Sequence, residues 1–508
     1  MGTIQSKKDG NISPAKKKPS NYLSKSLYIR GLQCHKSLYL EKFQRDLKSE
    51  TTAETQALFD SGHMVGEIAQ GLFPDGVLIP YIEAKNGVAE QLRLTNEAVK
   101  NGAKVIYEAS FQYDGIFIKV DILHKGHRGW EIYEVKGGTK LTPVYVDDAA
   151  LQYYVLTGAG IKVIKTFISY INNGYVRKGA LDAQKLFISE DITKQVKEKQ
   201  SFVIEQLKKQ RRMLSGKLPK IDIGPYCSDP YECDFCNHCW KHIPEDSVFD
   251  LREKGVDRFA LYAKRIIKQK DIPLDLLNKK QRQQVVATVK KQNAVDKQKI
   301  REFLKTLSYP LYFLDFETFM SAIPLYDGLK PYQQIPFQYS LHYQKKKGGK
   351  LYHTEFLAKP GIDPRKPLLD KMLAAVPEDV CILTYNMSFE KGVLTELATQ
   401  YPKHKKAIGK WIDNIQDLMV PFRQRDVYFW KFKGSYSIKN VLPVLVPQLS
   451  YEGLEIADGG AAMEAYHQMC AAKNNPEKLA QIRENLLAYC KLDTLAMVQI
   501  LETLGELI

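Results

Sequence analysis

Two carboxylates lie in a run of bulky apolar residues in the C-terminal part of the chain. The run Leu311–Phe319 (LYFLDFETF) contains Asp315 and Glu317 and has the composition of a buried strand. Residues two apart on a strand point to the same face, so the two carboxylates are expected side by side. Because adjacent buried negative charges are costly unless a cation neutralises them, the pair predicts half of a divalent-metal site. Acidic pairs at strand ends also serve as caps or surface charges, which is the alternative.

More acidic residues follow at spacings that fit the same site. Glu390 comes after a second apolar run, Val380–Tyr385, and an Asn-x-x-Phe turn. A late amphipathic helix, predicted to begin near Pro476, carries Tyr489 and Asp493 four residues apart and therefore on one face. This order of motifs resembles the DEDD exonuclease superfamily, in the subgroup that uses Tyr.

The resemblance implies a ribonuclease-H-like exonuclease domain over residues 308–508. In such a domain four carboxylates hold two magnesium or manganese ions, and the tyrosine, here Tyr489, orients the attacking water. The four carboxylates would be Asp315, Glu317, Glu390 and Asp493. The superfamily generally has Asp where this chain has Glu390. A domain of the same fold with only partly functional carboxylates is the alternative.

A second set of charged residues lies on two predicted strands of the N-terminal half. Asp121 is in the strand-like region Ala109–His124, and Glu134 and Lys136 end the strand Trp130–Lys136. Two carboxylates of this kind can share divalent metals, while the lysine can position water and steady the phosphate. The alternative is that these charges merely close a sheet edge.

The order of these motifs closely resembles the RecB-like nucleases of the PD-(D/E)xK class, which have a restriction-endonuclease-like fold. The resemblance covers residues 21–245 and implies catalytic roles for the residues just named. It makes Gln152, on a predicted helix over 147–156, the motif glutamine, and Glu67, on an earlier helix, a further metal ligand. Two positions depart from the family: Gly66 stands in the slot where a helix His is common, and Leu156 stands where a Tyr often follows the glutamine.

Four cysteines lie within thirteen residues, at positions 227, 233, 236 and 239. Clustered cysteines in a chain without an export signal indicate a metal site, and the x2 spacings suit zinc. RecB-like domains with one cysteine upstream and three downstream of the core resemble this chain more closely, and that resemblance implies a 4Fe-4S cluster. Its ligands would be Cys34, Cys227, Cys233 and Cys239, with Cys236 as the alternate. A local zinc site is the alternative, and Cys381, Cys470 and Cys490 are interpreted as packing residues.

Length and charge bound the remaining possibilities. The 508 residues suggest two or three domains, and the net charge of +16 favours a polyanionic partner. Residues 1–20 are expected to form a disordered basic tail, and residues 246–307 a basic helical connector, either a solvated linker or a path for a strand. With no membrane-spanning stretch and no secretory signal, the expected location is the cytoplasm, with no membrane partner.

Taken together, the chain is expected to be an α/β protein with these two domains. It resembles an uncharacterised bacterial family that fuses a RecB-like iron–sulfur nuclease domain to a DEDD-type domain. The expected function is a metal-dependent nuclease acting on DNA ends or single strands, with DNA favoured over RNA as the partner. The alternatives are a nucleic-acid-binding protein with degenerate centres and an RNA-processing exonuclease.

Overall fold

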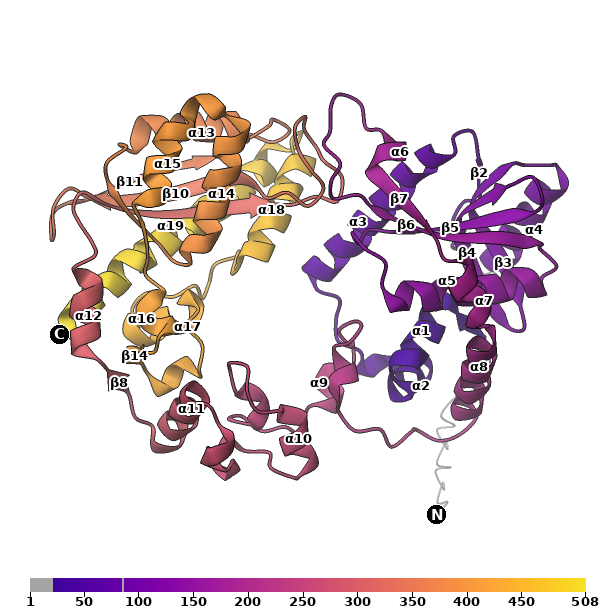
Figure 1. Cartoon of the computed structure of the whole chain (residues 1–508), viewed down its shortest axis with the longest axis horizontal. Helices are drawn as coiled ribbons and strands as arrows, with labels where there is room; N and C mark the ends of the chain where they lie inside the picture. Colours follow the sequence, from indigo (N-terminus) through magenta and orange to yellow (C-terminus); the bar gives the residue numbers. More distant parts are fainter. Residues whose placement is uncertain (1–21, 85) are drawn as a thin grey trace, which may run out of the picture.

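The computed structural model describes residues 22–84 and 86–508, so the predicted tail over residues 1–20 lies outside the described part. Two mixed sheets, of seven and five strands, are surrounded by helices, which confirms the α/β class (Figure 1). We refer to residues 22–245 as the N-terminal unit, 246–307 as the connector and 308–508 as the C-terminal unit. No helix in these described ranges is long and apolar enough to cross a membrane.

The seven-stranded sheet belongs to the N-terminal unit and has the order β2-β3-β4-β5-β6-β7, with β1 paired to β4. Its strands are β1 (Leu23–Ser24), β2 (Val77–Leu78), β3 (Val105–Tyr113), β4 (Ile116–Lys125), β5 (Trp130–Lys136), β6 (Val163–Ile171) and β7 (Phe187–Asp191). Strands β3 and β4 form an antiparallel hairpin. Asp114 and Gly115 make its turn, both with positive φ, as a two-residue turn matched to strand twist requires. Strands β5 and β6 are parallel because the chain crosses over through a helix between them.

Helices cover both faces of this sheet. On one face α1 (Lys25–Gln33), α2 (His35–Phe43), α4 (Gly87–Lys100), α5 (Pro143–Gly158), α7 (Thr193–Glu198) and α8 (Gln200–Leu214) bury the main core. The other face is covered by α3 (Ala53–Ala69), the turn η2 (Gln70–Leu72) and α6 (Ala183–Leu186). The sheet is therefore buried on both sides.

The five-stranded sheet of the C-terminal unit has the order β11-β10-β9-β12-β13. Its strands are β9 (Leu311–Phe319), β10 (Ile335–Gln344), β11 (Leu351–Leu357), β12 (Cys381–Thr384) and β13 (Ile415–Asp417). β9, β10 and β11 are antiparallel neighbours, whereas β12 runs parallel to both β9 and β13. The strand that carries the Asp315–Glu317 pair is thus the central strand of the sheet.

This sheet lies between two helical layers (Figure 1). On one side pack α13 (Arg365–Ala375), α14 (Met387–Gln400) and α15 (Lys405–Asp413), and on the other α16 (Val420–Arg423), α17 (Ile438–Leu445) and α19 (Pro476–Glu506). A further helix, α18 (Gly459–Ala471), packs against α19 and β9. Helix α19 begins at Pro476 as predicted, and Asn475 caps it by accepting the Lys478 N–H at 3.1 Å.

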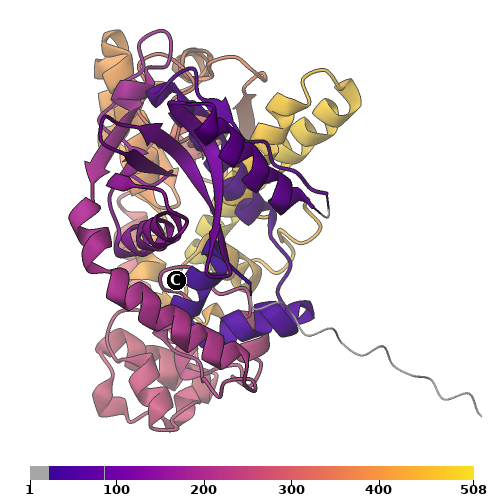
Figure 2. The same ribbon diagram turned by 90° about the vertical axis from the view of Figure 1, so that its right-hand side faces the viewer.

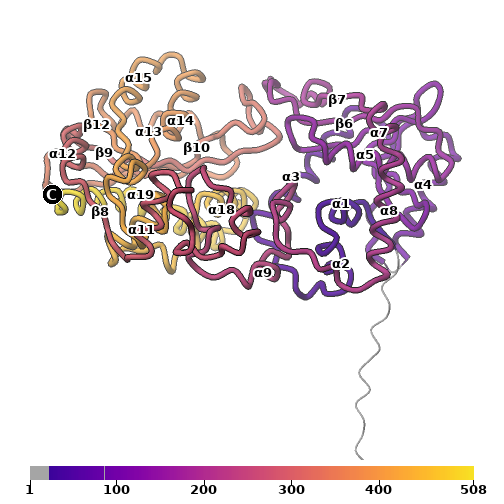
Figure 3. Tube along the Cα trace, turned by 60° about the horizontal axis from the view of Figure 1, so that its bottom comes forward, coloured from indigo at the N-terminus to yellow at the C-terminus, as the bar shows by residue number. Residues whose placement is uncertain are grey.

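The connector contains three α-helices joined by turns, and it is packed. Its helices α10 (Arg258–Ala263), α11 (Lys279–Lys290) and α12 (Lys297–Leu304) alternate with short turns. The first part of the connector lies at the bottom of Figure 2, and α11 and α12 are labelled along the trace in Figure 3. The connector has its own small core: Val248, Leu251, Leu261, Ile272, Leu277 and Val285. Strand β8 (Ala294–Val295) pairs with β14 (Val427–Tyr428), which attaches the connector to the C-terminal unit.

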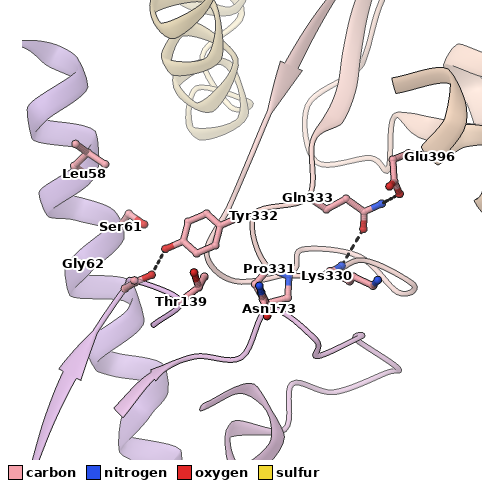
Figure 4. Close-up of a pocket in the computed structure, with 12 residues that line it drawn as sticks. Leu58, Ser61, Gly62, Thr139, Asn173, Lys330, Pro331, Tyr332, Gln333 and Glu396 are labelled. Atoms are coloured by element: carbon pink, nitrogen blue, oxygen red, sulfur yellow. Dashed lines mark hydrogen bonds between the residues drawn. The ribbon is translucent and has the colours of Figure 1, made fainter. Parts of the chain in front are cut away.

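The two units also touch directly, on the side away from the connector. Arg177 donates hydrogen bonds to the carbonyls of Pro324 (2.9 Å) and Leu325 (2.7 Å), and Tyr332 donates to the Gly137 carbonyl. Around this junction lies a pocket lined by α3, by the loop after β5 and by residues 330–333 (Figure 4). The loop that follows Lys136 is therefore held against the C-terminal unit.

Candidate catalytic sites and cysteine cluster

Four carboxylates converge at the centre of the C-terminal unit. Asp315 and Glu317 project from β9, Glu390 from the first turn of α14, and Asp493 from the middle of α19. Burial, and then Asp493, raise the pKa of Asp315 well above its usual range. Burial and then Asp315 do the same to the pKa values of Glu317 and Glu390. These mutual effects indicate that the four carboxylates lie near one another, and Asp315 and Glu317 have ligand oxygens within 4.8 Å of each other.

Two tyrosines and a lysine lie beside Asp493. The Tyr451 hydroxyl donates to Asp493 Oδ1 at 2.5 Å, and Tyr489 lies one helical turn before Asp493. Burial raises the pKa of Asp493 to about 6, although the hydrogen bond from Tyr451 and the charge of Lys439 lower it. The same lysine also lowers the pKa of Glu317. One nearby ammonium group leaves most of the charge of four carboxylates uncompensated, which suits a site for divalent cations.

Cys490 was interpreted from the sequence as a packing residue, and the structure places it in this cluster. Its thiol lies 3.6 Å from Asp315 Oδ2. One oxygen each of Asp315 and Glu317 and the Cys490 sulfur lie within 4.8 Å of one another. Its position next to Tyr489 in the sequence was the available signal.

In the N-terminal unit, Glu134 is the centre of a buried polar cluster. Its Oε1 accepts hydrogen bonds from Lys25 Nζ and Lys136 Nζ, each at 2.6 Å, and its Oε2 accepts from Gln152 Nε2 at 2.6 Å. Although burial opposes it, the charges of Lys136 and Lys25 hold the pKa of Glu134 below its usual range. The structure therefore joins three of the predicted residues and adds Lys25.

Asp148 is the second residue of this cluster that the sequence reasoning missed. Its carboxylate lies 2.6 Å from Lys136 Nζ and 3.5 Å from Lys25 Nζ. Asp148 precedes Gln152 by four residues on α5, so the shared helix face was a usable signal. Lys25 offered no such signal, because it comes from the distant helix α1.

Asp121 faces the same cluster from β4. Its Oδ2 accepts the Val135 N–H at 2.6 Å. Burial, and then the charge of Glu134, raise the pKa of Asp121 to about 8. Glu108 also raises the pKa of Asp121. It is a left-handed residue (φ 55°) opposite Asp121, at a position where the β3–β4 pairing is interrupted without a change of register.

Glu67 is exposed on α3, which packs against β5. No hydrogen bond or ion pair in the described part of the chain joins Glu67 to the other charged residues of the site. Its role as a metal ligand stays a prediction.

All five predicted cysteine ligands line one small cavity. Cys34 lies between α1 and α2, Cys227 ends the turn η3 (Pro225–Cys227), and the cavity is completed by residues 233, 236 and 239, the last two in α9 (Cys236–Cys239). Gln33 Nε2 donates to the carbonyls of Tyr226 (2.8 Å) and Tyr231 (2.6 Å), which ties the upstream helix to the downstream loop. The structure thus brings Cys34 to cysteines almost 200 residues further along the chain.

The sulfur atoms are widely spaced around this cavity. Within the described ranges, no three of them lie within 4.8 Å of one another. Zinc binds thiolates at about 2.3 Å, which brings the sulfurs of a tetrahedral site to about 3.8 Å from each other. The observed arrangement is wider than a zinc site. Burial, and then the neighbouring Cys233, raise the pKa of the Cys236 thiol to about 12, as expected for a thiol among thiols.

The geometry defines an α/β protein with two buried carboxylate clusters and a cysteine cluster. A family described as "Domain of unknown function (DUF2779)" matches residues 312–437, a segment that contains Asp315, Glu317 and Glu390. The chain is also 28% identical over 219 residues to "Uncharacterized protein MG366 homolog" of Mycoplasma pneumoniae, covering 40% of this chain and 33% of that protein. It is 27% identical over 213 residues to "Uncharacterized protein MG366" of Mycoplasma genitalium, covering 39% and 32%. The matched region spans about a third of the length of these relatives.

Proposed function

We propose that the protein is a metal-dependent nuclease that hydrolyses phosphodiester bonds of DNA, at ends or in single strands. The observation that carries the proposal is the convergence of four buried carboxylates with Tyr489 in the C-terminal unit. Buried, mutually repelling carboxylates are costly, so they are best explained by cations that neutralise them.

The topology supports the fold assignments that this function implies. The order β11-β10-β9-β12-β13, with three antiparallel strands followed by parallel ones, supports a ribonuclease-H-like fold for the C-terminal unit. In the N-terminal unit, the β3–β4 hairpin, β5 and the crossover to β6 support a restriction-endonuclease-like core.

The residues of the C-terminal cluster fit magnesium or manganese. Its donors are carboxylate oxygens, and Glu390 Oε2 is buried without a hydrogen-bond partner. Metal ions bound there supply the charge that activates water and stabilises the leaving oxygen. The ligands would be Asp315, Glu317, Glu390 and Asp493.

Tyr489 would position the water in this site. Burial, and then Asp493, hold the pKa of the Tyr489 hydroxyl above its usual range, so the group stays protonated at neutral pH and can donate a hydrogen bond. Tyr451 already donates to Asp493 and fixes the orientation of that carboxylate. The 3′ end of a strand would then be trimmed one nucleotide at a time.

The N-terminal cluster supports a second phosphodiesterase site. Asp121 and Glu134 would hold the metal, Lys136 would steady the phosphate, and Gln152 fixes one oxygen of Glu134. One observation favours a different role for this cluster. Lys25 Nζ lies 2.6 Å from Glu134 Oε1 and supplies the positive charge that a metal ion would otherwise provide. This ion pair favours a site that binds nucleic acid without cleaving it.

The cysteines fit a 4Fe-4S cluster better than zinc, because their sulfurs are spaced more widely than one zinc ion requires. Cys34, Cys227, Cys233 and Cys239 would hold the cluster, with Cys236 as the alternate. The cluster would join α1 and α2, and with them Lys25, to the loop downstream of the catalytic core.

The proposal is tested on the full chain, with single-stranded DNA and RNA oligonucleotides labelled at the 5′ or the 3′ end, in Mg²⁺, Mn²⁺ or EDTA. Metal-dependent loss of the 3′ label, abolished by Asp315→Ala and kept by Asp121→Ala, would assign 3′ trimming to the C-terminal site. The reverse pattern would assign cleavage to the N-terminal site. Degradation of RNA alone would support the RNA-processing alternative, and binding without cleavage would support the degenerate one.

A further inference from the structure

A pocket lies between the connector and the C-terminal unit. Its volume of about 660 Å³ is within the range of roughly 300–1,000 Å³ that is typical of ligand sites. The connector contributes residues 251–254 and Arg258, and the C-terminal unit contributes Tyr385, Asn386, Met419 and residues 434–438. Neither the connector nor the C-terminal unit forms this pocket alone.

The pocket is basic on its connector side. Arg252, Lys254 and Arg258 are all exposed there. Glu253 is the one acidic lining residue, and it lies 3.5 Å from Lys280 Nζ. The excess of positive charge favours an anionic ligand.

A buried arginine is influenced by residues that line this pocket. Arg425 is 7% exposed, and neither Nη1 nor Nη2 has a hydrogen-bond acceptor of suitable geometry, although the Tyr428 ring lies 4.8 Å away. Burial lowers the pKa of Arg425, while the nearby groups Tyr428, Glu253 and Tyr436 act to raise it. Glu253 and Tyr436, whose charges act on the guanidinium, both line the pocket. A buried guanidinium whose Nη atoms lack hydrogen-bond acceptors is costly unless an anion approaches it.

The pocket adjoins the carboxylate cluster. Asn386 directly precedes α14, which carries Glu390 in its first turn, and Ser437 directly precedes α17, which carries Lys439. Both helices therefore begin at the pocket, and their free N–H groups add positive potential. The Tyr385 hydroxyl donates to the Tyr436 carbonyl at 2.8 Å and joins the two segments that precede these helices.

We propose that this pocket binds the phosphate backbone of the single strand whose 3′ end reaches the carboxylates. The inference rests on the proposed function and adds the connector to the substrate-binding surface. The basic side chains and helix N-termini would contact phosphates, and Tyr436 offers a ring for base stacking.

The test measures binding of a fluorescein-labelled dT12 strand to the full-length Asp315→Asn variant by anisotropy at several salt concentrations. The pocket variant carries Arg252→Glu and Lys254→Glu in addition to Asp315→Asn. These two residues are chosen because neither side chain makes a hydrogen bond or ion pair in the described structure. The matched control is Lys403→Glu with Lys406→Glu, the same charge change on exposed residues at and near the start of α15. Thermal melting checks that both proteins fold.

The proposal predicts at least tenfold weaker binding for the pocket variant and less than twofold for the control. The slope of log K against log salt should fall in magnitude by about 1.4, for two phosphate contacts of a single strand. Equal losses of dT12 affinity in the two variants would overturn the proposal. Competition by polyglutamate as strong as that by unlabelled dT12 would overturn it as well. Failure of the proposed nuclease function would show separately, as an intact dT12 strand after incubation with the wild-type protein and Mg²⁺ or Mn²⁺.

Discussion

Lys25 illustrates how a single distant residue changes the chemistry of a site. It lies 109 positions before Glu134, and its ammonium group donates a hydrogen bond to Oε1 of that carboxylate. A metal ion that uses the same oxygen must displace the lysine. The ion pair therefore opposes metal binding in the N-terminal cluster.

Replacing Lys25 with Gln is accordingly expected to tighten Mn²⁺ binding at the N-terminal site by about tenfold, or ~1.4 kcal/mol. Calorimetric titration in an Asp315→Asn background isolates that site. The matched control is Lys165→Gln, an exposed lysine in β6 whose ion pair with Asp191 lies outside the cluster. Unchanged or weaker Mn²⁺ binding in the Lys25 variant would contradict this role.

The carboxylates of the C-terminal unit predict a pH dependence of stability in the metal-free protein. The pKa of Asp493 is raised from 3.8 to about 6, so the folded state binds more protons than the unfolded state between these values. This stability is fully present below about pH 3.8 and is lost as pH rises through about 6, by roughly 3 kcal/mol in total for this group.

Denaturant unfolding in EDTA at pH 5, 6 and 7 should show falling stability with rising pH, and Asp493→Asn should flatten the trend. Added Mg²⁺ should restore stability at pH 7 if the carboxylates bind it. A trend that Asp493→Asn leaves unchanged would show that other groups cause it.

Residue types and spacing were enough to predict most members of the C-terminal carboxylate cluster. Asp315 and Glu317 follow from strand periodicity, and Tyr489 and Asp493 from helix periodicity. Lys25, Cys490 and Tyr451 were missed because each meets its partner through tertiary packing, which no local pattern encodes. Asp148 shares a helix face with Gln152 and was within reach of the same reasoning that found Asp493.

At the scale of elements, the joint between the connector and the C-terminal unit depends on Gly434. Its φ is +77°, and an added Cβ would lie 2.4 Å from the Gln284 side chain. Gln284 is fully buried. Its Oε1 accepts a hydrogen bond from the Arg252 N–H, and its Nε2 donates one to the Asp250 carbonyl. A side chain at position 434 would thus disturb the rim of the basic pocket as well as the backbone.

Gly434→Ala is expected to lower the free energy of unfolding by roughly 2 kcal/mol, from backbone strain and the clash with Gln284. Gly453→Ala is the matched control, because its φ is +87° and no atom lies within 4 Å of an added Cβ. Gly453→Ala should lower the free energy of unfolding by about 1 kcal/mol, from backbone strain alone. Equal losses in denaturant unfolding would show that the contact with Gln284 contributes nothing.

Two strands were predicted with the correct bounds, whereas the apolar run Val380–Tyr385 extends one residue beyond β12 (Cys381–Thr384) at each end. The predicted ranges of β5 and β9 match the structure to the residue. The sequence pattern predicts a helix over Ala57–Gly71, and α3 begins four residues earlier, at Ala53. Thr52 caps it there by accepting the Thr55 N–H at 3.2 Å. The core of the connector was not foreseen, since its apolar residues are spread over several short helices and turns with no single period.

At the scale of the whole molecule, the chain closes on itself. The connector joins the two units on one side, and Arg177, Tyr332 and the contact of α3 with α18 join them on the other (Figure 1). The cysteine cavity lies in the N-terminal unit where the chain enters the connector, so its occupant would stabilise this part of the closed arrangement.

Anaerobically purified protein is therefore expected to contain iron and sulfide and to absorb broadly in the visible range. Cys34→Ser should lose both the metal and several kcal/mol of stability, because the ligand that ties α1 and α2 to the downstream loop is gone. Cys470→Ser is the matched control and should keep its iron, since Cys470 lies outside the cavity. Stoichiometric zinc that survives Cys34→Ser would instead indicate a local site of the downstream cysteines.

The most direct test of the nuclease proposal is the rate at which the full-length protein shortens a 5′-labelled single-stranded DNA in Mg²⁺ or Mn²⁺, compared with Asp315→Asn. The substitution keeps the shape of the side chain and removes one charged metal ligand. The proposal predicts a stepwise ladder from the 3′ end that EDTA abolishes and a rate at least about a thousandfold lower in the variant. A ladder of equal rate in the variant, or one that persists in EDTA, would contradict it.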